Sequence, residues 1–266
     1  MSALHEPLSF DAHTLLAGAS PAKVTLVGAG PGDPELLTLK AARVLREARV
    51  VLYDHLVGRD VLDLVPKDAH TFYVGKQSGC HTLSQNAIIE LMIRLARSGR
   101  PVVRLKGGDP FIFGRGGEEA QALARAGVPF EVIPGVSAAQ GAAASVGIPL
   151  THRDHACTLV FAAGHLRGEG DARTLDLDWQ ALARPRQTTV IYMGVATLPI
   201  ICEQLIRHGL PPSTPAAVVE RATRPDERTV DGTLETLPAL ARVYEVKSPA
   251  LIVIGGVAAV RSELAP

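Results

Sequence analysis

The sequence predicts an α/β protein built from two α/β domains, and three observations support this prediction. Strand-like apolar runs alternate with helical patterns through the first half, which is typical of a mainly parallel sheet with helices on both faces. A second series of strand-like runs begins near Thr151. Of the 266 residues, 47% are hydrophobic, which is enough for a sizeable core. We expect a leader over 1–22, an N-terminal α/β domain over 23–148 and a C-terminal α/β domain over 149–266.

In the first half, each strand is expected to lead to a helix. The run VTLVG predicts the first strand, and Asp33 with the proline after it predicts the start of a helix that extends to about Ala48. Ser84 is expected to cap a later helix that ends at Gly99. The other elements predicted in this half are strands at 50–54, 72–76, 101–105 and in FEVIPG, and helices at 116–126 and 137–146.

The second half is expected to add further strands with helices between some of them: TLVFAAGH, TTVIYMG, AAVVE, TVDGTL and PALIVIGG. In open α/β sheets, ligands bind beyond the carboxyl ends of the strands. The glycine-rich, charged and otherwise unusual residues cluster at such ends: Gly28 to Asp33, Asp54, Lys76, Gly107 to Asp109, Met193 and Glu220. We therefore expect an active site at these strand ends.

The charge balance and the cysteines narrow the class of protein. Lys plus Arg and Asp plus Glu both total 27, so the net charge is zero, which argues against nucleic-acid or membrane-surface binding outside a local basic pocket. No apolar run reaches the length of a membrane span, and the first residues lack the pattern of a signal peptide. Cys80, Cys157 and Cys202 show no paired spacing, which disfavours a disulfide framework and a zinc site and fits a reducing cytoplasm.

The stretch VGAGPGDPELLTLKAARVL is close to the glycine-rich loop of a dinucleotide-binding domain. Its glycines are Gly28, Gly30 and Gly32, so the third comes one residue earlier than in the G-x-G-x-x-G fingerprint. Asp33 follows and places a carboxylate at the helix N-terminus, where it would repel a pyrophosphate. The loop can bring backbone near a ligand but is a poor phosphate cradle, which argues against an NAD-dependent dehydrogenase.

The strand ends also carry a recognisable series of motifs: GAGPGDPELLTLKA, VGK, RLKGGDPFIFGRGGEE, PGVSAA, GIPLTHRD, YMG and VVE. Together they resemble the uroporphyrinogen-III C-methyltransferase family of the tetrapyrrole methylase superfamily, over about Lys23 to Val257. The resemblance implies a class III-type fold of two α/β domains with the active-site cleft between them. It also implies transfer of two methyl groups from S-adenosyl-L-methionine to uroporphyrinogen III, giving precorrin-2 by way of precorrin-1 and leaving S-adenosyl-L-homocysteine.

The resemblance further implies a cytoplasmic homodimer whose product feeds sirohaem, cobalamin or haem d1 biosynthesis, with no nucleic-acid or membrane partner. Some relatives carry a dehydrogenase/ferrochelatase domain ahead of the methylase. About 22 residues precede the first strand here, so we expect a monofunctional chain. A methylase that acts on a later precorrin stays open, because motifs encode the ring position poorly. The zero net charge disfavours an RNA methyltransferase of the same fold, and the charged residues at strand ends disfavour a non-catalytic binding module.

By resemblance, the methyl-donor site maps onto Pro31, Gly107, Gly108, Asp109, Ile112, Ser137, Ala138, Met193 and Ala222. The glycines allow close backbone approach, and Asp109 is expected to bind the amino group of the donor. Met193 would pack on the adenine or on the sulfonium arm. The chain departs from the family in two places, because relatives often have Thr-Ser or Thr-Ala in place of Ser137-Ala138 and Gly in place of Ala222.

The resemblance also assigns the acid/base positions, to Asp54 and Lys76. The alternative for Asp54 is that it caps the next helix or pairs with Lys76. Arg104 sits inside a predicted strand and is expected to be structural. The histidines lack metal-ligand spacing, so no metal is expected.

The carboxylates of the substrate suit arginine, whose planar fork binds them through two hydrogen bonds. Arg115 and Arg153 are the candidates, and Arg115 and Glu118 are also counted among the catalytic residues. Glu118 follows Arg115 by three residues and is expected to orient it or to accept a pyrrole N–H, the alternative being an ordinary helix-turn pair. His81 is a further candidate for a substrate carboxylate, with a loop histidine bonded to backbone as the alternative.

Overall fold

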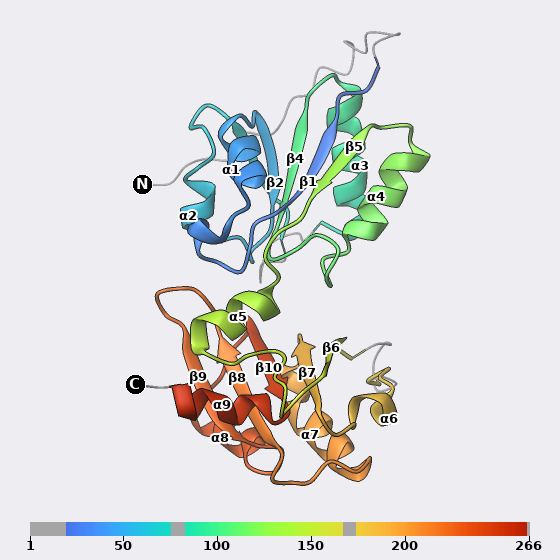
Figure 1. The fold of residues 1–266 in the computed structure, drawn as a ribbon. Helices are drawn as coiled ribbons and strands as arrows, with labels where there is room; N and C mark the ends of the chain where they lie inside the picture. Colours follow the sequence, from blue (N-terminus) through green and yellow to red (C-terminus); the bar gives the residue numbers. More distant parts are fainter. Residues whose placement is uncertain (1–19, 76–82, 167–173, 265–266) are drawn as a thin grey trace.

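The computed structural model describes residues 20–75, 83–166 and 174–264, and it contains two five-stranded sheets. Figure 1 shows the two sheets one above the other, each with its own helices. In the described ranges, no helix has both the length and the apolar character needed to cross a membrane.

The first sheet is parallel throughout. Its strands are β1 (Val24–Gly28), β2 (Val50–Tyr53), β3 (His70–Tyr73), β4 (Val102–Lys106) and β5 (Phe130–Ile133). Their order is β3-β2-β4-β1-β5, and every neighbouring pair runs parallel. All residues of β1 and β4 are buried, as expected of central strands that are covered on both faces. The predicted mainly parallel sheet is confirmed.

Helices cover both faces of this sheet (Figure 1). They are α1 (Leu39–Arg46), α2 (Arg59–Leu62), α3 (Gln85–Arg97) and α4 (Gly116–Arg125). Successive strand residues point to opposite faces. Leu26 accordingly packs in the core cluster under α3 and α4, whereas its neighbour Val27 packs in the cluster under α1 and α2. These two clusters hold the parallel sheet between two helical layers.

The helix predicted after Asp33 is divided into two pieces. Asp33 caps only the short 3-10 helix η1 (Pro34–Leu36), in which its side chain accepts a 2.8 Å hydrogen bond from Glu35 N. Leu37 is extended, and Thr38 caps α1 by accepting from Ala41 N at 3.1 Å. The prediction of one continuous helix was wrong because the chain contains a second N-cap residue five positions after the first. The predicted cap Ser84 is confirmed, since it accepts from Ala87 N.

The second sheet has mixed strand directions. Its strands are β6 (Thr158–Ala163), β7 (Gln187–Tyr192), β8 (Pro215–Glu220), β9 (Arg228–Thr233) and β10 (Ala250–Ile254), in the order β6-β7-β10-β8-β9. Only β6 and β7 run parallel, and the other three neighbouring pairs are antiparallel. The remaining helical elements are α5 (Ala138–Val146), α6 (Trp179–Leu182), η3 (Val195–Thr197), α7 (Leu198–Arg207), α8 (Leu237–Val243) and α9 (Val257–Leu264).

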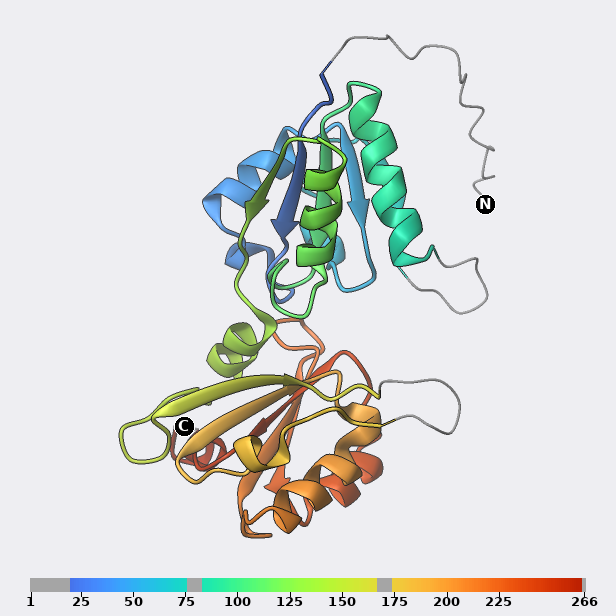
Figure 2. The ribbon, with the colours of Figure 1, turned by 90° about the vertical axis from the view of Figure 1, so that its right-hand side faces the viewer.

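Helix α5 lies between the two sheets, as Figures 1 and 2 show. It follows β5 of the first sheet, but Ala139 and Ala142 on it pack in the core cluster of the second sheet together with α9. Helices α6, α7 and α8 cover the opposite face of that sheet. A segment expected in the N-terminal domain thus packs against the second sheet.

Candidate active site

Three loops meet at the carboxyl edge of the first sheet. The loop after β1 and the loop after β4 are joined by two backbone hydrogen bonds, from Gly108 N to Gly30 O at 2.7 Å and from Gly30 N to Gly108 O at 3.2 Å. The carboxylate of Asp109 accepts from Phe111 N at 2.8 Å and from Gly135 N, which follows β5, at 3.1 Å. Asp109 therefore holds two of these loops together.

Helix α5 and these loops approach each other closely at glycine residues, which lie both on the helix and in the loops. A Cβ on Gly141 would lie 2.4 Å from Pro31 Cγ, so Pro31 packs directly on α5. A Cβ on Gly108 would lie 3.4 Å from Ala138 N at the start of that helix. Gly107 lies against Leu56 in the loop after β2. The loops of the first sheet and the N-terminal part of α5 are therefore in contact.

The second sheet contributes an apolar cluster to the same region. Ile112, Ala138 and Ala222 come from three separate segments and all pack against the core cluster that contains Tyr192. Burial raises the pKa of the Tyr192 phenol, whose oxygen accepts from Ala139 N at 3.1 Å. The residue after it, Met193, has a left-handed backbone (φ 56°) and is 49% exposed.

Ser137 is buried at the N-cap of α5, where its side chain accepts from Gln140 N at 3.3 Å. The structure thus brings the loops after β1 and β4 into contact with α5, and Ile112, Ala138 and Ala222 pack on one cluster. Met193 directly follows Tyr192 of that cluster.

The loop after β8 also bridges the two sheets. Thr223 Oγ1 accepts from Asp33 N at 3.1 Å, and Arg224 Nη2 donates to Leu56 O at 2.7 Å. Beside these contacts is a hollow of about 560 Å³ between the two halves. Its lining comes from both, and comprises Gly32, Asp33, Pro34, Gly58, Arg59, Asp60, Thr223, Arg224, Pro225 and Asp226. Sequence reasoning did not single out Thr223 or Arg224.

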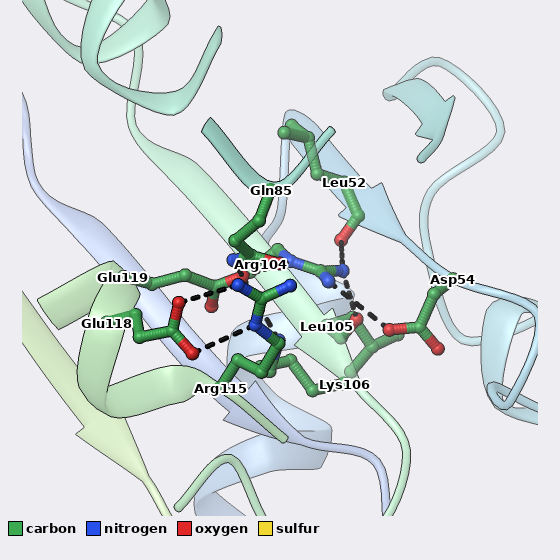
Figure 3. Close-up of polar contacts among 9 residues, drawn as sticks. All are labelled: Leu52, Asp54, Gln85, Arg104, Leu105, Lys106, Arg115, Glu118 and Glu119. Atoms are coloured by element: carbon green, nitrogen blue, oxygen red, sulfur yellow. Dashed lines mark hydrogen bonds and ion pairs between the residues drawn. The ribbon is translucent and has the colours of Figure 1, made fainter. Parts of the chain in front are cut away.

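Asp54 follows β2 and keeps 20% of its side chain exposed. Its Oδ1 accepts from Leu56 N at 3.1 Å, so the residue orders the following turn. It does not cap the next helix, since the N-cap of α2 is Gly58. Its Oδ2 accepts from Arg104 Nη2 at 3.2 Å (Figure 3). Lys76, the other predicted acid/base residue, lies outside the described residues.

Arg104 and Lys106 belong to a buried charge network that the sequence analysis did not predict. Both lie on β4, and Glu119 on α4 is their shared partner: its Oε1 accepts from Arg104 Nε at 3.2 Å and from Lys106 Nζ at 3.1 Å. Gln85 on α3 donates to the same oxygen at 3.0 Å. Burial lowers the pKa of Lys106, the charge of Arg104 lowers it further, and Glu119 opposes both effects.

The sequence did contain a signal for this network. Two cations at positions i and i+2 of a strand share one face, and buried cations need a counter-charge. Arg104, expected to be only structural, contacts the predicted acid/base residue Asp54.

Arg115 and Glu118 form an ion pair near the site. Arg115 Nε donates to Glu118 Oε1 at 2.9 Å and Arg115 Nη2 donates to Oε2 at 2.7 Å, with the side chains 55% and 53% exposed. This contact raises the pKa of Arg115 and lowers that of Glu118. The predicted orientation of Arg115 by Glu118 is present, in the geometry that an ordinary helix-turn pair would also have.

One predicted substrate ligand, Arg153, is not brought to this place. Arg153 precedes β6, and Met193 follows β7, the parallel neighbour of β6. Six residues of strand separate the two ends, about 20 Å at 3.3 Å per residue, so Arg153 lies at the opposite end of the second sheet from Met193. His81 lies outside the described residues.

The fold and the site define a two-sheet α/β protein whose candidate site lies where the strand ends of a parallel sheet meet a second unit. The model of the tetrapyrrole (corrin/porphyrin) methylase family matches residues 23–238. The siroheme synthase of Gluconacetobacter diazotrophicus is 58% identical over 244 residues, which are 91% of this chain and 51% of that protein. The chain belongs to the tetrapyrrole (corrin/porphyrin) methylase family, and it spans about half the length of the siroheme synthases that it matches.

Solved structures give the same relationship. The uroporphyrin-III C-methyl transferase of Thermus thermophilus, complexed with S-adenyl homocysteine, is 46% identical with a TM-score of 0.76, and the match covers 90% of this chain and 94% of that one. A cobalt precorrin-4 methyltransferase of cobalamin biosynthesis is 31% identical with a TM-score of 0.77, over 89% of this chain and 95% of that one.

Proposed function

We propose that this chain transfers two methyl groups from S-adenosyl-L-methionine to uroporphyrinogen III, giving precorrin-2 by way of precorrin-1. One observation carries the proposal: the chain matches, over 90% of its length, a uroporphyrin-III C-methyl transferase that was solved with S-adenyl homocysteine. The names of the related siroheme synthases favour sirohaem biosynthesis as the pathway that the product enters.

The proposed donor site is the group of loops around the start of α5. Its residues are Pro31, Gly107, Gly108, Asp109, Ile112, Ser137, Ala138, Met193 and Ala222. The residues fit such a ligand, because glycine and alanine leave backbone groups within reach and Met193 offers an exposed apolar side chain. Asp109 already accepts two backbone N–H groups, but an ionised carboxylate has about four acceptor positions, so it retains capacity for the donor's ammonium group.

S-adenosyl-L-methionine supplies an activated methyl group, so the protein contributes mainly position and proton transfer. We propose Asp54 for the proton, because its carboxylate is partly exposed at a strand end and is held in one orientation by Leu56 and Arg104. Lys76 stays a prediction for the same step.

For the substrate carboxylates we propose Arg115, whose guanidinium is exposed and oriented by Glu118. The position of Arg153 at the far end of the second sheet does not support a place beside Arg115. His81 stays a prediction.

We also propose that the protein acts in the cytoplasm as a homodimer on this tetrapyrrole. The support is the family resemblance together with the cysteine pattern. Analytical ultracentrifugation tests the dimer, and a monomer at micromolar concentration would reject it.

An anaerobic assay with purified protein, S-adenosyl-L-methionine and uroporphyrinogen III, read by mass spectrometry, tests the function. The expected result is a gain of two methyl groups. The similarity to a cobalt precorrin-4 methyltransferase makes a later precorrin the second candidate substrate. No methyl gain on uroporphyrinogen III, with donor binding confirmed by calorimetry, would reject the proposal and favour that candidate.

A further inference from the structure

Three side chains donate hydrogen bonds to one carboxylate oxygen of the buried Glu119. Glu119 has no exposed surface, and Gln85, Arg104 and Lys106 all donate to its Oε1 at 3.0–3.2 Å. Its Oε2 is buried, and among the described residues it has no hydrogen-bond partner. A buried charge is costly unless it is paired. The Glu119 carboxylate provides the counter-charge for two buried cations, Arg104 and Lys106.

Arg104 connects this carboxylate to Asp54. Its Nε donates to Glu119, its Nη1 donates to Leu105 O at 3.0 Å, and its Nη2 donates to Asp54 Oδ2. Figure 3 shows the guanidinium of Arg104 between the two carboxylates, which come from α4 and from the end of β2. A guanidinium is planar, so fixing one edge on Glu119 also fixes the direction of the donor that faces Asp54.

We propose that Glu119 is a positioning residue for the methyl transfer, and that it acts through Arg104 to set the orientation and the charge environment of Asp54. The inference rests on the proposed function, in which Asp54 takes part in proton transfer. It follows the arrangement in which a catalytic group is oriented by a second residue that is itself held by a third.

The charge of Glu119 has a definite effect on Asp54. Arg104 now faces two carboxylates, and without the negative charge of Glu119 its positive charge would act on Asp54 alone. Opposite charges attract, so the loss strengthens the hold of Arg104 on the Asp54 carboxylate. The other groups that sense Asp54 are Lys106 on β4 and Tyr73 on β3. Arg104, which is in direct contact and always protonated, dominates over both.

The test is the pH profile of methyl transfer by Glu119→Gln, measured beside the wild type on the same substrate. The acidic limb is expected to move to lower pH by about 0.5–1 unit, and kcat to fall because Arg104 then holds the Asp54 carboxylate more strongly. A matched control is Gln85→Leu, which removes a neutral donor from the same oxygen and should leave the limb where it is. Calorimetry with S-adenosyl-L-methionine shows whether the donor site survives.

An active Glu119→Gln variant with the wild-type limb and wild-type kcat would overturn the inference while leaving the proposed function intact. A wild type with no transfer at any pH would overturn the proposed function, and the inference with it. If Glu119→Gln does not fold, the test uses Glu119→Asp instead. This variant keeps the negative charge, but its shorter side chain moves the carboxylate away from Arg104. That variant is expected to lose kcat with an unmoved limb, and a wild-type kcat would overturn the inference.

Discussion

The guanidinium of Arg115 and the carboxylate of Glu118 meet through two hydrogen bonds, of 2.9 and 2.7 Å, one turn into α4. Arg115 is the N-cap residue of α4, and its backbone is left-handed, with φ 58°. The pair presents an exposed and pre-oriented cation within the loop that follows β4. A second carboxylate, from a ligand, can use the remaining donors of the same guanidinium.

Arg115→Ala is expected to lower kcat/KM for uroporphyrinogen III by about 10- to 150-fold, because hydrogen bonds to charged groups contribute about 1.5–3 kcal/mol. The affinity for S-adenosyl-L-methionine should stay at the wild-type value, as measured by calorimetry. Joint loss of turnover and donor binding would indicate misfolding, and wild-type kcat/KM would remove Arg115 from substrate binding.

Asp54→Asn is expected to slow methyl transfer by about 10²- to 10⁴-fold, the usual contribution of a general acid or base. The substituted side chain still offers an oxygen to Leu56 N, so the turn after β2 should persist. Rates are read by mass spectrometry at saturating donor. Near-normal turnover would exclude Asp54 from an essential proton transfer.

Two substitutions of Asp109 distinguish the effect of its charge on donor binding from its effect on the order of the loops. Asp109→Ala removes the acceptor for both Phe111 N and Gly135 N, whereas Asp109→Asn can retain one of the two. Both variants should weaken binding of S-adenosyl-L-methionine, because both remove the charge that faces its ammonium group. The alanine variant should also lose more stability, by about 1 kcal/mol for the additional hydrogen bond, in denaturant unfolding. Unchanged donor affinity in Asp109→Asn would reject the proposed contact.

The two cysteines in the described part of the chain should differ in reactivity. Burial raises the pKa of Cys202 to about 12, whereas Cys157 is exposed. The thiolate is the reactive form, so at pH 8 the native protein should be alkylated by iodoacetamide at Cys157 and spared at Cys202. Peptide mass spectrometry checks this, with denatured protein as the positive control. Native labelling of Cys202 at the same rate as Cys157 would contradict the buried position.

The sequence predicted the parts of the fold that depend on local pattern. Ser84 and the apolar spacing after it specify α3, and the buried strands of the first sheet follow from their continuous apolar runs. The division of the helix after Asp33 was missed because Thr38 is a second N-cap residue. Strand direction in the second sheet could not be read, since apolar runs such as those of β8 and β10 have the same pattern in parallel and antiparallel pairs.

The site could be predicted only as far as its motifs reach. Asp109 and Met193 lie on segments that a strand-end argument identifies. Glu119 was not predicted because a charged residue on an amphipathic helix is usually solvated. Glu119 is buried only because α4 packs over β4. The motif around Arg153 predicted a place at the substrate site. Because of the direction of β6, Arg153 lies at the end of the second sheet opposite to Met193.

Helix α5 is covalently continuous with one sheet and packed on the other, and it carries Ala138 directly beside Gly108. Any change in the relative placement of the two sheets therefore alters the distance between Ala138 and Gly108, which a single ligand would contact together. Occupancy of such a site and the relative placement of the two sheets are thermodynamically linked: a ligand that contacts both groups stabilises the assembled molecule by an amount that grows with its concentration over its Kd. A higher donor concentration is then expected to raise the melting temperature of the protein.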